Sequence, residues 1–302
     1  MHDCKPFRHS QRLGVSGTST CKHVLHPYPQ ANPAKNTTTI FVMYNKVVHL
    51  ILSFLLLFSC IIHVSCDDYP PLQIQQDLRA TTLGSQNQGN INVWSSVAVY
   101  DASVATADFT AIELYALAQL AHDEMKADFV KPGSTLGKKR QPATMAAMAI
   151  GNLVYFSSSI KSKTNYIMDL KKNDVINQKL NQCMATLEAK RELQSGQIKK
   201  HMNNAQCGEI TCLQMQRLDT MPKPNWDTTP KKAIVAYGPS DDPNFRGDVP
   251  KACCGETGDL TIWGCAAFMA QEGLTTYPTP APGTPLVLPA AKPLSSRFVG
   301  LC

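Results

Sequence analysis

The spacing of apolar residues predicts two long helices in the middle of the chain. Apolar positions recur with the helical period from Ile112 to Met125, after Thr106 or Asp108 as the capping residue. They recur again over residues 176–187, after the Asn173-Asp174 pair as a second cap. We therefore expect two amphipathic helices of four to five turns each.

Strand-like segments flank the first of these helices and follow the second. Residues 144–150 and 153–160 are apolar runs separated by Gly151-Asn152, the pattern of a β-hairpin with a two-residue turn. Residues 91–100 and 233–237 are predicted to be two further strands.

Two shorter helices are predicted to begin at cysteines. One follows Cys207 and the other opens at Cys265. From residue 275 onward the chain carries six prolines, so we expect an extended tail with Leu286–Leu288 as one edge strand. The mixture of helices and strands indicates an α/β fold, with a mixed sheet flanked by helices.

An almost unbroken apolar run, Val47–Val64, follows Lys46 and precedes the small residues Ser65-Cys66. A charge, an apolar core and a small-residue cleavage site, in this order, are typical of a secretory signal. Met43 would be a conventional start for such a signal, which would leave residues 1–42 upstream of the translated protein. The competing interpretation is a retained membrane anchor, since the run approaches the length of a bilayer span. We expect cleavage and a secreted protein without stable membrane association.

The charge of the chain changes when that segment is set aside. The whole sequence has 29 basic and 23 acidic side chains, of which six and one, respectively, precede Asp67. The remainder therefore carries 23 basic and 22 acidic side chains, a balance of +1. Proteins that bind nucleic acid through its phosphates need clustered positive charge, and a short run such as Lys138–Arg140 is more typical of a solvated loop. We expect a small-molecule substrate and no nucleic-acid partner.

Seven cysteines follow the predicted cleavage site. They are Cys183, Cys207, Cys212, Cys253, Cys254, Cys265 and Cys302. Extracellular cysteines ordinarily form disulfides. An odd number of cysteines means either that at least one thiol stays free or that three cysteines bind a metal ion. A disulfide between Cys254 and Cys265 would contribute about 2–3 kcal/mol. Cys253 could replace Cys254 in either role.

The triplet Cys207-Gly208-Glu209 carries the strongest chemical signal in the sequence. The positive end of a helix stabilises a thiolate at its start, and a carboxylate two residues later lies beside the sulfur without sharing its metal ion. Catalytic zinc sites use three protein ligands and leave a fourth position open for water. His122-Asp123-Glu124 also spells a metal-binding triplet, but it lies near the end of its helix without an adjoining strand in the right order, so we exclude it.

The order of helix, hairpin, Cys-x-Glu helix, strand, cysteine pair and helix resembles the cytidine deaminase-like superfamily. Within it, Gln206-Cys-Gly-Glu209 and Ile262-Trp-Gly-Cys265 are similar to the motifs of secreted fungal deaminase-like proteins, and the resemblance covers residues 108–274. It implies a three-layer α-β-α fold with a mixed sheet.

The same resemblance implies roles for individual residues. Cys207 takes the place of the first zinc ligand, Cys254 and Cys265 take the places of the paired cysteines, and Glu209 takes that of the catalytic proton shuttle. Ten residues separate the later two cysteines where the family usually has two, so a loop must fold Cys254 back toward Cys265.

A division of the chain into four parts follows. These are an upstream segment with the signal (1–66), an N-terminal extension (67–107), the deaminase-like domain (108–274) and a proline-rich tail (275–302). Residues 161–206 would be an insertion between the hairpin and the Cys-Gly-Glu helix.

The function expected from these features is zinc-dependent hydrolytic deamination of a small amino-bearing base or nucleoside. Asn152 and His201 are the candidate substrate-binding residues. The first alternative is a secreted binding or effector protein of the same fold, without catalysis, whose cysteines are oxidised. The second is a thiol hydrolase that uses Cys207 with His201.

Overall fold

The computed structural model describes residues 69–86, 91–131, 140–162, 166–167, 174–192, 205–254 and 264–301. The apolar run of residues 47–64, the candidate substrate-binding residue His201 and Cys302 lie outside the described residues. Within the described part of the chain, no helix combines the length and the apolar composition needed to cross a membrane.

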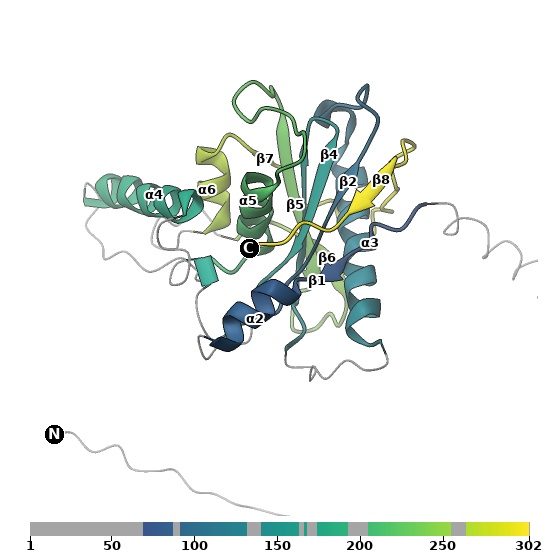
Figure 1. Cartoon of the computed structure of the whole chain (residues 1–302), viewed down its shortest axis with the longest axis horizontal. Coiled ribbons are helices and arrows are strands. Elements are labelled where there is room, and N and C mark those ends of the chain that lie inside the picture. The colour runs from purple at the N-terminus through teal and green to yellow at the C-terminus, as the bar shows by residue number, and fades with distance from the viewer. Residues whose placement is uncertain are drawn as a thin grey trace, which may run out of the picture. The chain divides into compact units, whose positions relative to one another are not determined.

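One open sheet forms the centre of the fold (Figure 1), and eight strands belong to it among the described residues. The strands are β1 (Gln75–Gln76), β2 (Trp94–Val99), β3 (Met145–Ile150), β4 (Leu153–Ser158), β5 (Lys232–Pro239), β6 (Asp248–Lys251), β7 (Thr275–Thr276) and β8 (Ser295–Arg297). Their main order is β1-β2-β4-β3-β5-β6, with β8 beside β2 and β7 beside β5. The β5–β7 pair is parallel and the other pairs are antiparallel. The predicted mixed sheet is thus a mostly antiparallel one.

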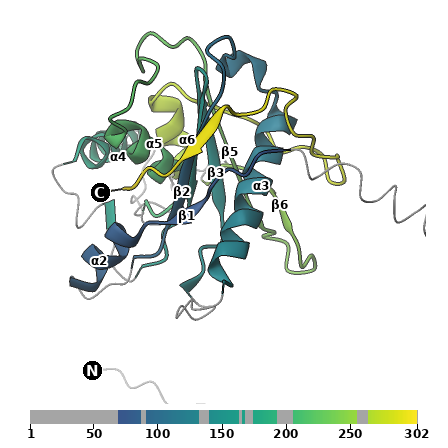
Figure 2. The same ribbon diagram turned by 45° about the vertical axis from the view of Figure 1, so that its right-hand side comes forward.

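Five α-helices pack with this sheet in the described residues. They are α2 (Leu78–Gln86), α3 (Ala111–Phe129), α4 (Val175–Glu192), α5 (Gly208–Leu218) and α6 (Cys265–Gln271). Helix α3 covers one face of the sheet, while α5 and α6 lie on the opposite face with α4 beside them (Figure 2). The structure is therefore an α/β protein with helices on both faces of its sheet.

The central strands are buried on both faces because their side chains alternate between two hydrophobic clusters. On β3, Ala146 and Met148 belong to the cluster under α5, whereas Met145 and Ala147 belong to the cluster under α3. Successive side chains of a strand point to opposite faces, so apolar residues are favoured on both faces of these strands. This explains why apolar residues follow one another along the two segments from which the hairpin was predicted.

The hairpin of β3 and β4 is confirmed, with Ile150 opposite Leu153 across the Gly151-Asn152 turn. Gly151 has a φ of +58°, a conformation that favours glycine because other residues have a Cβ that clashes there. The turn therefore fixes the register that directs each hairpin side chain to its own face.

Helix α3 begins later than predicted. Thr110 is its cap: the Thr110 Oγ1 accepts a hydrogen bond from the Glu113 N–H (3.2 Å), and a Glu113 carboxylate oxygen accepts one from the Thr110 N–H (2.8 Å). This reciprocal pair is a capping box. The predicted caps Thr106 and Asp108 instead lie in a preceding 3₁₀ turn (Thr106–Asp108). Asp174, by contrast, does cap α4, because its Oδ1 accepts from the Ile176 N–H (2.9 Å).

The C-terminal segment joins the same compact unit as the sheet, with β8 as an added strand at β2. The edge strand predicted at Leu286–Leu288 is wrong, since β8 lies at Ser295–Arg297. Beyond it, Leu301 is fully buried and its N–H donates to the Asp77 carboxylate (2.7 Å). The end of the chain thus closes the core on the face that carries α5.

Candidate metal centre

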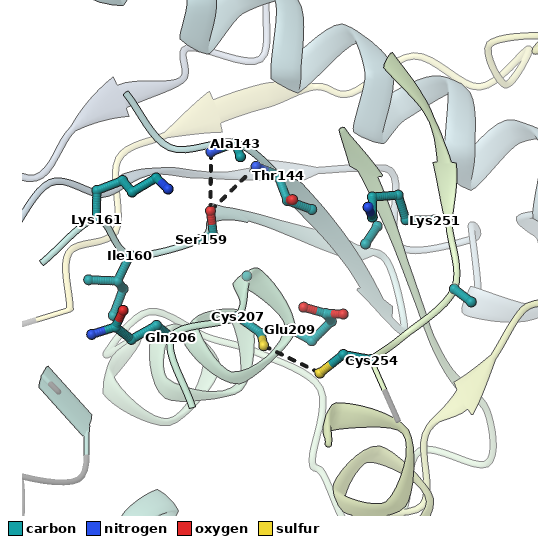
Figure 3. A pocket seen from close by; sticks show the side chains of 13 residues that line it. Ala143, Thr144, Ser159, Ile160, Lys161, Gln206, Cys207, Glu209, Lys251 and Cys254 are labelled. Atoms are coloured by element: carbon teal, nitrogen blue, oxygen red, sulfur yellow. Dashed lines mark hydrogen bonds between the residues drawn. The ribbon is translucent and has the colours of Figure 1, made fainter. Parts of the chain in front are cut away.

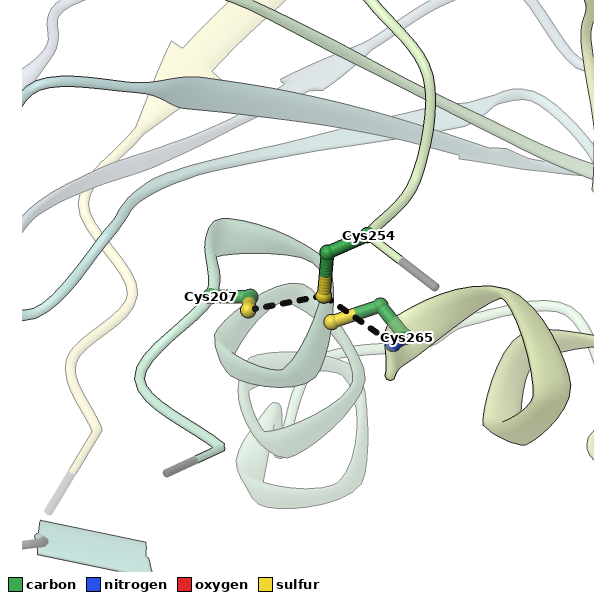
Figure 4. Close-up of side chains that lie close together, drawn as sticks. All are labelled: Cys207, Cys254 and Cys265. Atoms are coloured by element: carbon green, nitrogen blue, oxygen red, sulfur yellow. Dashed lines mark hydrogen bonds between the residues drawn. The ribbon is translucent and has the colours of Figure 1, made fainter. Parts of the chain in front are cut away.

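Three cysteines from three separate segments converge at one point (Figure 4). Cys207 is the N-cap of α5, Cys254 follows β6, and Cys265 is the first residue of α6. Their sulfur atoms all lie within 4.8 Å of one another, and the Cys207 and Cys254 sulfurs are 3.5 Å apart. These are the three cysteines that the sequence motifs singled out.

Gly208 allows the first of these sulfurs to lie close to the sheet. A Cβ at this position would be 2.6 Å from the Ser157 carbonyl oxygen and 3.0 Å from the Ala146 Cβ. One turn later, the Thr211 hydroxyl donates to the Ser158 carbonyl (3.2 Å). The first turn of α5 therefore lies directly on the β3–β4 hairpin, and the glycine of Cys-Gly-Glu makes that close approach possible.

Cys254 is folded back onto the start of α6, as its wide spacing from Cys265 requires. The Cys265 N–H donates to the Cys254 sulfur (3.2 Å), and the Ala266 N–H donates to the Cys254 carbonyl (3.0 Å). Gly264 again permits the contact, because a Cβ there would lie 2.3 Å from the Cys254 carbonyl oxygen and 2.8 Å from its sulfur. The first turn of α6 thus binds the preceding cysteine through its backbone.

The geometry of the triad fits a zinc ion. Two sulfurs bound at about 2.3 Å to one tetrahedral zinc ion are about 3.8 Å apart, a value between the 3.5 Å of the Cys207–Cys254 pair and the 4.8 Å within which all three sulfurs lie. The 3.5 Å between Cys207 and Cys254 is far longer than a disulfide bond of about 2.05 Å, and all three residues are thiols in the structure. Three thiol donors, which leave the fourth coordination position of a tetrahedral metal ion open, are typical of zinc and other thiophilic metal ions. These three cysteines could therefore hold zinc.

Burial and the contacts among the sulfurs favour the protonated form of the thiols. The hydrogen bond with Cys254 and burial raise the pKa of Cys207 well above its ordinary value. Burial, followed by the contacts with the two neighbouring sulfurs, does the same to the pKa of Cys265. A bound metal ion reverses this, since a coordinating thiol gives up its proton.

Glu209 lies beside the triad and is only 4 % exposed. Burial raises its pKa to about 7, and the nearby Cys254 sulfur adds to that effect, while hydrogen bonds from its own backbone and from Cys253 oppose it. A carboxyl group with a pKa near neutrality can both accept and release a proton at that pH. The position that the sequence assigned to a proton shuttle therefore holds a group suited to that role.

Two cysteines of the triad, Cys207 and Cys254, border a pocket of about 400 Å³ together with Glu209 (Figure 3). Besides Cys207, Cys254 and Glu209, it is lined by Ala143, Thr144, Ser159, Ile160, Lys161, Gln206, Gly208, Ala236, Lys251 and Ala252. Pockets of this size suit small organic ligands. Two cysteines of the triad and one carboxylate thus face a space that a small molecule could enter.

Asn152 lies at the closed end of the hairpin, whereas the pocket is lined by residues at its open end, such as Thr144 and Ser159. The Asn152 amide donates to the Tyr100 carbonyl (2.8 Å). His201 lies outside the described residues.

The excluded triplet His122-Asp123-Glu124 has structural partners. The His122 Nε2 lies 3.0 Å from the Ala143 carbonyl, and the Glu124 carboxylate accepts from the Leu72 and Ile74 N–H groups (2.7 and 3.1 Å).

Sequence reasoning missed the two lysines that line the pocket, Lys161 and Lys251. Lys161 directly follows the predicted strand 153–160, so a basic residue at a strand end was the available signal. Lys251 lies on β6, a strand that the sequence pattern did not predict.

No protein-family model, curated protein or solved structure matches this chain.

Proposed function

We propose that the protein is a secreted zinc-dependent hydrolase that deaminates a small amino-bearing base or nucleoside. One observation carries the proposal: three cysteine sulfurs from separate segments lie within 4.8 Å of one another, with Glu209 next to them in the wall of a pocket. Such an arrangement needs long-range folding of three segments and would be an unusual outcome for cysteines that only fill the core.

In this proposal each residue has a defined task. Cys207, Cys254 and Cys265 hold the metal ion, which when bound supplies the Lewis acidity that activates water for attack. Glu209 would take one proton from the attacking water and deliver it to a ring nitrogen, and then take the second proton from the new hydroxyl group and deliver it to the departing amine. The water oxygen becomes bonded to the ring carbon, the carbon–nitrogen bond to the amine breaks, and ammonia leaves.

The surroundings of Glu209 support this role. Its side chain is almost inaccessible to bulk solvent apart from the pocket, so protons move between substrate and carboxylate without competition from bulk water. The first turn of α5 fixes its position against the hairpin through Gly208 and Thr211.

The proposal extends to the fold and to the location of the protein. Helices on both faces of a sheet, with the Cys-x-Glu motif opening one of them, support a cytidine deaminase-like three-layer α-β-α arrangement. The apolar run of residues 47–64 supports secretion. The nearly balanced charge of the remaining chain supports a small-molecule substrate.

The test is ammonia release from a panel of amino-bearing bases and nucleosides, using protein purified without chelator. We expect at least one compound to release ammonia with the unchanged protein and with Glu188→Gln, an exposed control on α4. Glu209→Gln should be inactive while it keeps its metal. Equal turnover by Glu209→Gln would refute the shuttle. An inactive, metal-free protein with oxidised cysteines would instead support the non-catalytic binding protein.

A further inference from the structure

The pocket beside the metal centre has two chemically different sides (Figure 3). Glu209, Cys254 and Lys251 gather at one side, and Lys161, Ile160 and Gln206 gather at the other. The first side contains the groups that the proposed reaction uses. The second side contains a cation to which that reaction gives no task.

Backbone hydrogen bonds hold Lys161 to Asn92 and the preceding residue to Gln206. The Lys161 N–H donates to the Asn92 carbonyl and the Lys161 carbonyl accepts from the Asn92 N–H, both at 3.0 Å. The preceding Ile160 N–H donates to the carbonyl of Gln206 (2.8 Å), the residue next to Cys207. These bonds tie the base of the lysine side chain directly to the segment that delivers the first sulfur.

The two lysines of the pocket differ in their partners. Lys251 forms an ion pair with Asp241 (2.6 Å) and donates to the Pro239 carbonyl (2.9 Å). Lys161 is exposed, and no carboxylate among the described residues forms an ion pair with it. Among the described residues that line the pocket, Glu209 has the single carboxylate, and it lies on the far side. The charge of Lys161 is therefore available to a ligand that enters the pocket.

We propose that Lys161 binds an anionic group of the substrate, so that the protein acts on phosphorylated or carboxylated amino-bearing compounds in preference to neutral ones. The reaction named here rests on the proposed function, whereas binding of the anion does not. An ammonium group is a common phosphate ligand, and its attraction for an anion is stronger at a partly enclosed pocket than in open water. The substrate would extend from Glu209 to Lys161, with its amine at one end and its anion at the other.

The experiment is calorimetric binding of three matched ligands: a nucleoside, its 5′-monophosphate and its 5′-carboxylate. The base should be one that releases ammonia with this protein or, if none does, each of the common amino-bearing bases in turn. We expect at least one of the two anions to bind about tenfold more tightly than the nucleoside at low salt, and this ratio to fall as salt is added. The anionic ligand that binds more tightly shows whether phosphate or carboxylate is the preferred group.

Variants assign the effect to the lysine. Lys161→Gln should reduce the anion-to-nucleoside ratio to below about twofold and leave nucleoside binding unchanged, and Lys161→Arg should restore much of it. Lys131→Gln, at an exposed lysine paired with Asp128 and absent from the pocket wall, should retain the full ratio. A ratio near one in the unchanged protein, no measurable binding of either anion, or an undiminished ratio in Lys161→Gln would each overturn the proposal.

The outcomes separate this inference from the proposed reaction. If no compound releases ammonia but the anion ratio holds and depends on Lys161, the anion site stands and deamination fails. If a neutral compound releases ammonia and the ratio is near one, the reaction stands and the anion site is refuted.

Discussion

Helix α5 has a buried carboxylate at each end, and the pKa values of the two groups are shifted in opposite directions. Glu209 lies in its first turn, and Asp219 is its C-cap. Both residues are at most 5 % exposed. The pKa of Glu209 is raised, whereas the pKa of Asp219 is lowered.

The difference lies in the partners that each carboxylate has. Burial alone would raise the pKa of Asp219, but its Oδ2 accepts from Arg297 (2.6 Å) and from the Tyr155 hydroxyl (2.8 Å), and these donors outweigh it. Among the described residues no lysine, arginine or histidine forms an ion pair with Glu209, so burial determines its pKa. A buried carboxylate with an ion-pair partner and hydrogen-bond donors stabilises the fold, whereas one without an ion-pair partner can exchange protons near neutral pH.

The largest expected effect comes from replacing the carboxylate in the first turn of α5, to which we assign proton transfer. Glu209→Gln should lower ammonia release about 10²–10⁴-fold, the usual contribution of a proton-transferring side chain. Because no ion pair is lost and a carboxylate whose pKa is raised by burial becomes a neutral amide, its free energy of unfolding at pH 7, measured by urea denaturation, should not fall. A loss of stability comparable to that of an Asp219 variant would show that the carboxylates at the two ends of α5 stabilise the fold equally.

Replacing the carboxylate at the other end should have the opposite profile. Asp219→Asn leaves Arg297 without its partner, and we expect a loss of about 2–3 kcal/mol in the free energy of unfolding, below the full cost of a broken buried pair because the Arg297 side chain is 27 % exposed. Asp227→Asn, on an exposed loop, is the control and should change stability little. Zinc content should stay the same, since the metal centre is at the far end of α5.

The pH dependence of this loss provides a second check. Asp219 has a lowered pKa in the folded protein, so its contribution is present above the ordinary aspartate pKa of about 3.9 and disappears as pH falls through the folded value. The difference in the free energy of unfolding between the unchanged protein and Asp219→Asn should therefore be constant above about pH 5 and become smaller below about pH 4. A difference that widens on acidification would contradict the assigned ion pair.

A smaller effect is expected from crowding the metal centre itself. In Gly264→Ala the new methyl group meets the carbonyl and sulfur of Cys254, and displacing that sulfur should weaken zinc binding about tenfold, measured by competition with a chromogenic chelator. Gly273→Ala adds the same group just beyond α6, where the nearest atoms, those of Lys232, lie 3.8 Å away; its φ of +73° strains the backbone there, but the new methyl group does not meet Cys254. It should leave zinc affinity unchanged; equal weakening by both would mean that the contact with Cys254 is irrelevant.

The smallest effect should come from the second donor to Asp219. Tyr155→Phe removes one hydrogen bond and leaves the Arg297 pair intact, so we expect a loss of about 1 kcal/mol in urea denaturation. Ammonia release should be unaffected. A loss larger than that of Asp219→Asn would show that Tyr155, rather than the ion pair, organises this end of the helix.

The elements predicted correctly from the sequence are those whose pattern is local. The hairpin, α4 and the starts of α5 and α6 depend on nearby signals: apolar runs, a Gly-Asn turn and caps. Cys207 and Cys265 stand at predicted helix starts, whereas Cys254 was assigned to the candidate metal centre only through the family resemblance.

The elements that were missed depend on distant partners. Strand β6 contains Pro250 and has little apolar pattern, yet it pairs with β5 at the edge of the sheet, where a proline is tolerated. Strand β8 is polar and exists through its pairing with β2, about 200 residues earlier, as Val97 opposite Arg297 illustrates. The Asp219–Arg297 pair could not be predicted for the same reason.

The most direct test of the metal centre is the zinc content of the purified protein. Protein prepared without chelator should contain about one zinc ion per chain. Cys207→Ser should lose it, and Cys212→Ser should keep it, because Cys212 is buried on the same helix and its thiol donates to the Ala146 and Tyr155 carbonyls instead. Zinc-free protein with its thiols reduced, or full zinc content in Cys207→Ser, would contradict the account.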